Sequence, residues 1–432
     1  MRAVEWHNSV LESLWPEGRL RRHDLARIEQ ELERRGTMAM QPLASGLFPA
    51  AAIDGSASAS GYGHVWVRDN VYVAYAHSVC GQTEVACAAL RAIFDFFGKF
   101  RRRFDAIIAH EVDSGDVMQR PHVRFDGEHI KEISERWSHA QNDALGYALW
   151  LYARLAAAGA IDLDARAVGT LTLFPRYFDA IRFWEDEDSG HWEEARKQSA
   201  SSIGTVVAGL DALRALCATR GPELRAHGFT SRLMDQTSAL AARGQAALDA
   251  ILPSECIQLS PRQNRRYDAA LLFLVYPLEV VDSTRSELIL SDIHRYLSGD
   301  IGVRRYLRDS YWAPDYDEHL RLEDRTRDFS EDMEVRDGLL DRIGHEAEWC
   351  IFDPILSAYY GRRYYDTGAP SDLERQELHL RRALAQITPA WTCPELYYRK
   401  HGVFVPNPNT PLRWTQANLK VALGSMHKNV EG

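Results

Sequence analysis

The spacing of apolar residues is the feature that most restricts the fold of this chain. In residues 82–97, 141–157 and 202–217, apolar side chains recur every three or four positions and therefore share one face of a helix. The same spacing predicts further helices in residues 10–35, 170–185, 232–252, 266–275, 283–297, 349–361, 371–385 and 415–423. Strand-like alternation is scarce and the sequence has no βαβ rhythm, so the chain is predicted to be all-α.

The helical pattern continues along the chain without a low-complexity linker, which predicts a single domain over residues 1–432. One segment interrupts the pattern. Residues 307–342 form a charged excursion that contains DYDEHLRLEDRTRDFSEDMEVRDG. Such a run is most often a solvated surface segment. Long loops in compact domains are often functional, however, so a lid over a site is the alternative interpretation.

Composition argues against several classes of function. The formal net charge of −10 lacks the positive footprint of a protein that binds nucleic acid or an anionic membrane. No apolar stretch approaches the length of a membrane span, and residues 1–20 lack the continuous apolar core of a secretory signal. We therefore expect a cytoplasmic protein.

Cysteine and histidine spacing does not indicate a metal or cofactor site. The six cysteines lack CxxC spacing and are expected to be free buried thiols. The segment GHEAEW has Trp349 where a HExxH zinc motif needs its second histidine. In GYGHVW, Trp66 occupies the third glycine position of a dinucleotide-binding loop. No metal and no cofactor is therefore predicted.

The segments between the helices concentrate aromatic, acidic and arginine side chains. They are SGYGHVWVRDN, SERWSHAQNDA, SGHWEEARKQ, GVRRYLRDSYW, HEAEW and CPELYYRKHGVFVPNPNTPLRWTQ. An alternating helix barrel would bring one set of such loops to one end. Aromatic faces there would stack on a sugar ring, and charged groups would bind its hydroxyls. The pattern thus indicates a carbohydrate pocket.

Taken together, these loops resemble glycoside hydrolase family 15, the glucoamylase family, and its relatives, the phosphorylase kinase regulatory subunits. The resemblance extends from about residue 62 to residue 414 and implies an (α/α)6 barrel. The block YGHVWVRDN implies that Arg68 and Asp69 hold hydroxyls of the terminal glucose. It also implies that Trp66 is part of the pocket wall and that Tyr62 lies near the attacking water.

The other family blocks imply the catalytic pair. RWSHAQNDALG resembles the block with a substrate-stacking tryptophan, here Trp137. GHWEEAR matches the block that implies Glu193 as general acid, with Trp192 before it and Glu194 after it as substrate ligands.

GVRRYLRD resembles the arginine-tyrosine block and implies Arg305 as a further ligand. PELYYRKHGVFVPNPNTPLRWTQA resembles the last block, which implies Glu395 as general base and Trp414 at the entry to the closing helix.

Several alternatives stay open at this point. HEAEW carries two carboxylates that many family members lack, so Glu348 competes with Glu395 as base and is kept as a site residue. Arg68 and Asp69 could form a structural ion pair at a helix start, with Asp69 as N-cap. Trp137 and Trp414 could be core aromatics. The excursion is atypical of glucoamylases and resembles the kinase-subunit relatives.

The chemistry explains why two distant glutamates are required. Inverting hydrolysis needs a protonated and an ionised carboxyl group on opposite sides of the anomeric carbon, about 6.5–9.5 Å apart. The adjacent residues Glu193 and Glu194 cannot face one point across a sugar. The neighbouring carboxylate of Glu194 and the apolar Trp192 are instead expected to keep Glu193 protonated.

These inferences predict an inverting exo-α-glucosidase that releases glucose from the non-reducing end of short substrates, such as isomaltose or malto-oligosaccharides. The predicted partner is an oligosaccharide, with no nucleic acid and no membrane. The alternatives are a trehalase and a non-catalytic carbohydrate-binding regulatory module.

Overall fold

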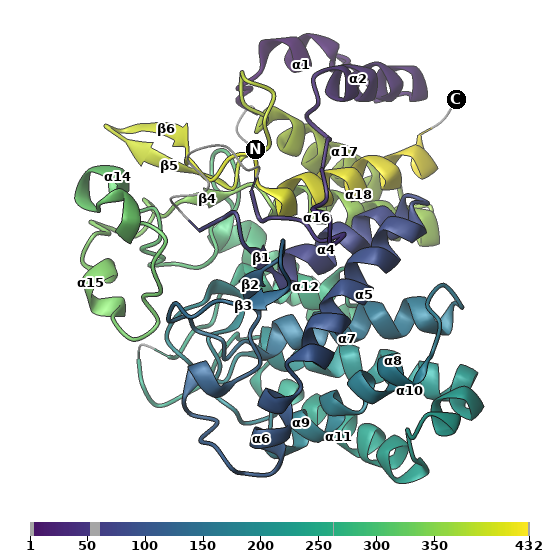
Figure 1. Ribbon diagram of the computed structural model, residues 1–432. Coiled ribbons are helices and arrows are strands. Elements are labelled where there is room, and N and C mark those ends of the chain that lie inside the picture. Colours follow the sequence, from purple (N-terminus) through teal and green to yellow (C-terminus); the bar gives the residue numbers. More distant parts are fainter. Residues whose placement is uncertain (1–3, 52–60, 262, 431–432) are drawn as a thin grey trace.

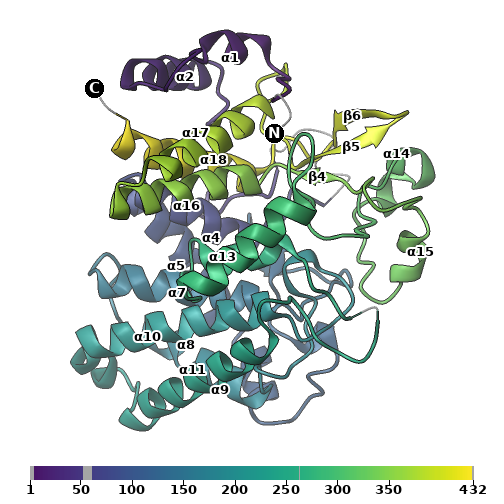
Figure 2. The same cartoon turned by 180° about the vertical axis from the view of Figure 1, so that it is seen from behind.

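The computed structural model describes residues 4–51, 61–261 and 263–430. Within these residues, helices alternate along the chain between an inner and an outer ring (Figures 1 and 2). The inner ring consists of α4 (Val67–Val79), α7 (Asn142–Ala157), α10 (Ala200–Ala226), α12 (Leu272–Val275), α16 (Phe352–Thr367) and α18 (Arg413–Asn429). The outer ring consists of α2 (Arg22–Arg34), α5 (Thr83–Lys99), α8 (Ala165–Leu171) with α9 (Leu173–Ala180), α11 (Ser231–Ile251), α13 (Ser283–Asp292) and α17 (Pro370–Ala385).

Contacts between the inner helices close the ring. α4 contacts α7, α7 contacts α10, and α10 contacts α12. Between α12 and α16, the ring of Phe273 stacks on that of Phe352 with centroids 5.9 Å apart. α16 then contacts α18, and α18 returns to α4. The predicted all-α fold and (α/α)6 barrel are confirmed.

Burial distinguishes the two rings. α4 and α7 are buried on almost every face, whereas α5 buries one face against its neighbours and exposes the other. A helix that is apolar all round belongs in a core, and an amphipathic helix covers one. The outer helices therefore cover the inner ring.

We expected no apolar stretch that approaches the length of a membrane span, and α10 corrects this expectation. It is long and apolar enough to cross a membrane by length and composition, with a mean hydropathy of 1.3 in its most apolar window. However, 67% of that window is buried inside the protein, as expected for the core helix of a barrel.

Two small antiparallel sheets lie in the loops that precede inner helices. In the first, β1 (Val65–Trp66) pairs with β2 (Arg124–Asp126), which pairs with β3 (Lys131–Glu132). In the second, β4 (Glu348–Trp349) pairs with β5 (Leu396–Lys400), which pairs with β6 (Val403–Pro406). β1 runs directly into α4, and β4 is followed after two residues by α16.

The remaining helices are short. They are α1 (Ser9–Leu14), α6 (Arg102–Ile108), α14 (Tyr316–His319), α15 (Met333–Asp337), η1 (Val117–Gln119), η2 (Gly190–Trp192), η3 (Ala269–Leu271), η4 (Ile293–Leu297) and η5 (Leu322–Asp324). α14, η5 and α15 belong to the charged excursion, which lies on the same side of the molecule as β5 and β6 (Figure 1).

α1 and α2 form a second apolar cluster with α17 and α18, apart from the main core. The prediction of one domain over residues 1–432 stays a prediction.

Candidate active site

A cavity lies at the N-terminal ends of the inner helices and encloses about 750 Å³ of empty space, part of it open to solvent. Ten of the twelve site residues predicted from the sequence line it. They are Tyr62, Trp66, Arg68, Asp69, Trp137, Trp192, Glu193, Arg305, Glu395 and Trp414. The other two, Glu194 and Glu348, lie outside the cavity.

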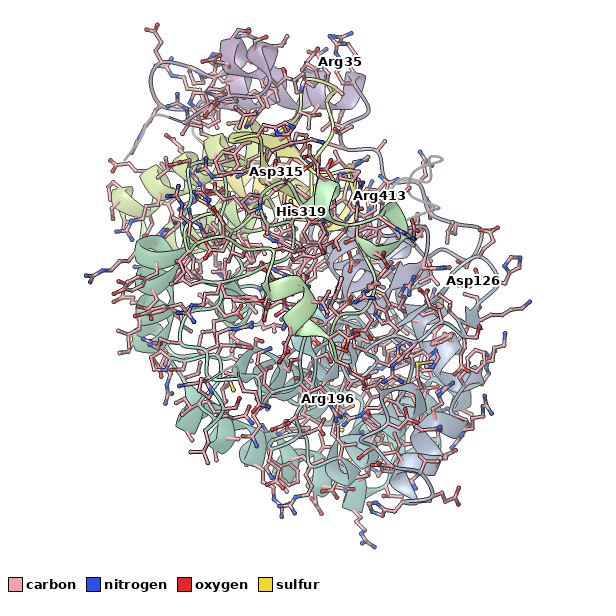
Figure 3. All side chains as sticks on the ribbon, turned by 90° about the vertical axis from the view of Figure 1, so that its left-hand side faces the viewer. Arg35, Asp126, Arg196, Asp315, His319 and Arg413 are labelled. Carbon is pink, nitrogen blue, oxygen red and sulfur yellow. The ribbon has the colours of Figure 1, made fainter. Side chains whose placement is uncertain are left out.

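The position of each lining residue follows from the barrel. Trp66 directly precedes α4, Arg68 and Asp69 lie in its first turn, and Trp414 lies in the first turn of α18. Glu193 lies in the loop before α10, and Glu395 directly precedes β5. Because all inner helices begin at the same end of the barrel, residues far apart in sequence meet there. Figure 3 faces this side, with Arg196 just after the Glu193 loop and Arg413 at the start of α18 labelled.

An unusual backbone conformation separates the two adjacent glutamates. Glu193 has left-handed dihedral angles, φ 57° and ψ 44°, directly after η2. This region is sparsely populated by residues other than glycine, and such strain is often found at functional sites. The turn directs the side chain of Glu193 into the cavity, whereas that of Glu194 is buried in the wall.

The Glu193 carboxyl group is weakly paired. Its Oε1 atom lies 3.7 Å from Nη1 of Arg68 and has no hydrogen-bond partner in the described part of the chain. Burial raises the pKa of Glu193 to about 7, although the positive charges of Arg68 and Arg124 oppose this. The group can therefore be protonated near neutral pH, as a general acid requires.

Glu395 is held by several donors. Its Oε1 accepts a hydrogen bond from the Tyr62 hydroxyl at 2.8 Å, and its Oε2 accepts from Nδ2 of Asn409 at 2.9 Å and from Nδ2 of Asn407. Burial raises the pKa of Glu395, while these three donors oppose the increase by stabilising the ionised form. The Tyr62 hydroxyl is also 3.1 Å from that of Tyr311.

Asp69 is electrostatically coupled to both cavity glutamates. Burial raises its pKa to about 7; Arg68 opposes this increase, and the charges of Glu193 and Glu395 add to it. Asp69 is not the N-cap of α4, because Trp66 holds that position. Arg68 pairs with Asp143 instead of Asp69, with Nε 2.5 Å from Oδ2. The alternative of an ion pair between Arg68 and Asp69 at the helix start is therefore wrong.

Aromatic side chains form a large part of the cavity wall. Trp66 and Trp137 meet edge to face with centroids 5.9 Å apart, and the Arg124 guanidinium lies 4.0 Å above Trp137. The indole N–H groups of Trp137, Trp349 and Trp414 lack a hydrogen-bond partner among the described residues. Trp192 differs, because its N–H donates to Asp268 at 2.9 Å.

Strand alternation keeps Glu348 out of the cavity. In β4, Glu348 pairs with Tyr397 and Trp349 with Leu396. Adjacent side chains of a strand point to opposite faces, so Trp349 lines the cavity and Glu348 points away from it. The Glu348 carboxylate accepts the backbone N–H groups of Ile301 at 2.7 Å and Gly302 at 3.0 Å. The structure therefore does not bring Glu348 to the position of a competing base.

Glu194 lies at the centre of a buried polar cluster. It accepts hydrogen bonds from the Tyr306 hydroxyl at 2.6 Å, Nη2 of Arg305 at 3.0 Å and Nη2 of Arg336 at 2.6 Å. Arg265 approaches its other oxygen at 3.3 Å. Burial disfavours ionisation, but the guanidinium groups outweigh it and hold the pKa of Glu194 well below its usual range. Glu194 therefore contacts Arg305 instead of the cavity.

Several lining residues were not predicted from the sequence. Tyr311 and Trp349 lie in the recognised segments GVRRYLRDSYW and HEAEW, but nothing in either segment marked them as lining residues. The excursion contributes a wall as well, formed by Thr326, Arg327, Asp328, Phe329 and Arg336. The alternative interpretation of the excursion, as a lid over a site, agrees with this position.

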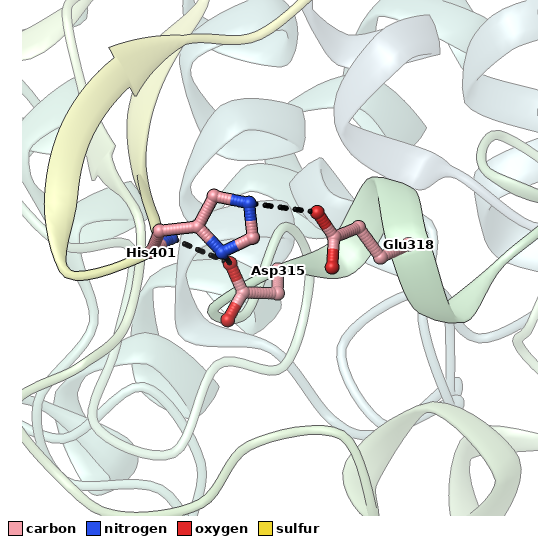
Figure 4. A group of neighbouring side chains, drawn as sticks. All are labelled: Asp315, Glu318 and His401. Atoms are coloured by element: carbon pink, nitrogen blue, oxygen red, sulfur yellow. Dashed lines mark hydrogen bonds and ion pairs between the residues drawn. The ribbon is translucent and has the colours of Figure 1, made fainter.

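A cluster of Asp315, Glu318 and His401 lies outside the cavity lining (Figure 4). His401 donates its backbone N–H to Asp315 at 2.7 Å, and its Nε2 lies 3.0 Å from Glu318. The cluster attaches the excursion to the turn between β5 and β6.

Two relatives of known name are similar in sequence to this chain. A probable phosphorylase b kinase regulatory subunit alpha of Drosophila melanogaster is 25% identical over 77% of this chain and 26% of its own length. The chain thus spans about a quarter of that subunit. An isomaltose glucohydrolase of Kribbella flavida is 25% identical over 67% of this chain and 73% of its own length.

Solved structures share the fold. A glycosidase variant superimposes with a TM-score of 0.68 at 19% identity, covering 96% of this chain and 100% of that one. A bacterial glucoamylase complexed with acarbose gives a TM-score of 0.62 at 15% identity, covering 89% of this chain and 53% of that one. Residues 31–316, more than half of the chain, match the family described as glycosyl hydrolases family 15. The chain therefore belongs to glycosyl hydrolases family 15.

Proposed function

We propose that this protein is an inverting exo-α-glucosidase that acts on short α-glucosides such as isomaltose or malto-oligosaccharides. The observation that carries the proposal is the difference between two carboxyl groups in one cavity. Glu193 is weakly paired and has a pKa near 7, whereas Glu395 is held by three hydrogen-bond donors. These are the properties of a general acid and a general base.

The reaction follows from this difference. Glu193 gives its proton to the glycosidic oxygen as the bond from that oxygen to the anomeric carbon breaks. A water molecule attacks the opposite face of the anomeric carbon, and Glu395 accepts a proton from it. Arg68 and Asp69 bind hydroxyls of the terminal glucose. The product is β-glucose, with the configuration inverted.

Three observations support the substrate class. Residues 326–329 line the cavity, and we infer that this wall limits the space beyond the terminal sugar, which favours short substrates. One relative is named an isomaltose glucohydrolase, and one structure of the same fold holds acarbose.

The six cysteines are free thiols, which supports a reducing compartment such as the cytoplasm.

The test is glucose release from isomaltose, maltose, trehalose and longer dextrins, with the anomer followed by NMR. We expect initial β-glucose, and loss of at least about 100-fold in kcat for Glu193→Gln and for Glu395→Gln. Glu348→Gln is the matched control outside the cavity, and circular dichroism checks that each variant folds. Initial α-glucose would contradict inversion, and loss of activity in Glu348→Gln alone would overturn the choice of base.

A second candidate function is a non-catalytic carbohydrate-binding module. The match to a kinase regulatory subunit over 77% of this chain favours it. Binding of acarbose without glucose release from any of these substrates would support this function and contradict hydrolysis. Preferred release from trehalose would instead identify a trehalase.

A further inference from the structure

The excursion, residues 307–342, contacts the segments that carry both candidate catalytic glutamates. On one side, the backbone N–H of Asp315 donates to the backbone carbonyl of Arg399 at 2.8 Å, and Lys400 forms an ion pair with Asp317 at 2.5 Å. Arg399 and Lys400 end the strand that follows Glu395. The other side of the excursion reaches Glu194, directly after Glu193, through Arg336.

Arg336 is buried although many of its neighbours on the excursion are exposed. Only 4% of it is accessible, compared with 56% of the adjacent Val335. Its Nη2 donates to Oε1 of Glu194 at 2.6 Å, and its Nε donates to the Ser310 hydroxyl at 3.1 Å. Burying an arginine is costly unless it is paired, so this position depends on Glu194.

Arg336 and Arg305 share one carboxylate oxygen. Nη2 of Arg305 donates to the same Oε1 of Glu194 at 3.0 Å, and Arg305 also binds Asp309 through two bonds of 2.6 Å. The Arg305 guanidinium lies 5.1 Å from the Trp192 ring and 5.0 Å from the Trp349 ring, both in the cavity wall. Glu194 therefore fixes the position of a cavity residue.

The ion-paired charges of this cluster balance only when Arg336 is present. The cations are Arg265, Arg305 and Arg336, and the anions that pair with them are Glu194, Asp268 and Asp309. Without Arg336, a buried cluster next to Glu193 carries a net negative charge.

We propose that Arg336 is a positioning residue of the active site, which docks the excursion on Glu194 and thereby holds Arg305 in the cavity wall. Neither Glu194 nor Arg336 needs to react with substrate for this role. The inference rests on the proposed function insofar as the bound ligand is an α-glucoside.

The test is a double-mutant cycle in the full chain with Arg336→Met, Glu194→Gln and the double variant. Kinetics on isomaltose give kcat and KM. Tryptophan fluorescence during an acarbose titration gives Kd, because Trp192 and Trp349 flank Arg305. Arg321→Met, on the exposed surface of the same excursion, is the matched control.

We expect Arg336→Met to lower kcat/KM and weaken acarbose binding by about tenfold, and Arg321→Met to change neither. In the Glu194→Gln background, Arg336→Met should cost less than about threefold, because both residues act through one contact. Arg336→Lys should recover part of the loss, because lysine keeps the positive charge. If Arg336→Met does not fold, Arg336→Lys takes its place in the cycle.

Multiplicative effects of the two substitutions, or unchanged values in Arg336→Met, would overturn the inference. If the unmodified protein releases no glucose, hydrolysis fails as the proposed function. The acarbose Kd values then still decide whether Arg336 positions Arg305.

Discussion

The difference between Glu193 and Glu194 shows how far a residue pattern predicts a site. The sequence predicted different roles for the adjacent glutamates, general acid for Glu193 and substrate ligand for Glu194, and the positive φ of Glu193 explains how their side chains point apart. It could not place Glu194, because the arginines around it come from three separate segments, at positions 265, 305 and 336. Only the folded chain brings these charges together.

The raised pKa of Glu193 has a consequence for stability. Its folded-state pKa of about 7 lies above the ordinary value of 4.5, so the folded state binds this proton more tightly than the unfolded state. The contribution of Glu193 to the free energy of unfolding is fully present below about pH 4.5 and is lost as pH rises through about 7. The total loss is about 3 kcal/mol. Glu193→Gln should therefore raise Tm relative to the unmodified protein at pH 8 and change it little at pH 5. Calorimetry measures Tm, and an equal Tm difference between the two proteins at pH 5 and at pH 8 would contradict the raised pKa of Glu193.

Tyr62 should influence catalysis through Glu395. Its hydroxyl donates to the Glu395 carboxylate and lowers the pKa of that group. Tyr62→Phe removes this donor, raises the pKa of the base and should move the acidic limb of the kcat/KM profile to higher pH. At low pH we expect a loss of about 10- to 100-fold. Tyr75→Phe is the control, since that hydroxyl contacts Tyr276, which does not line the cavity. An identical acidic limb in Tyr62→Phe would refute this role.

Among whole elements, helices of both rings were predicted from the sequence, whereas the inner α4 and the outer α8 were missed. α5 and α11 have one buried face, and their apolar residues show the helical period. The inner helix α4 was not predicted, because its apolar residues form a continuous run at positions 71–76 instead of recurring every three or four positions. Residues 10–35 were predicted as one helix, but Pro16 and Gly18 lie between α1 and α2, and both residues favour breaks. Strands of two residues, such as β4, are too short for an alternating pattern.

The excursion also leads to a prediction about substrate length. Phe329 is buried and lines the cavity, and Arg327 stacks on its ring with the guanidinium 4.3 Å from the centroid. Phe329→Ala should open this wall and raise the kcat/KM ratio of isomaltotriose to isomaltose by about tenfold. Leu322→Ala, on the exposed surface of the same excursion, should leave the ratio unchanged. If Phe329→Ala also leaves it unchanged, the wall does not limit substrate length.

At the scale of the whole molecule, the site depends on the complete ring. Glu193 precedes α10, Glu395 lies between α17 and α18, and Arg68 lies in α4, so opening the barrel anywhere separates residues that a ligand would hold. A ligand that binds only the folded state should therefore stabilise the entire barrel, by about 2.7 kcal/mol at a concentration 100 times Kd.

Calorimetry with increasing acarbose tests this dependence together with the single-domain prediction. We expect one cooperative transition whose Tm rises with acarbose, because α17 and α18 join the cluster around α1 and α2 to the main ring. The control is Arg68→Met, which removes a cavity cation and should abolish the rise in Tm while the transition stays single. Two transitions, of which only one responds to acarbose, would show that part of the chain unfolds independently of the barrel and would contradict a single domain over residues 1–432.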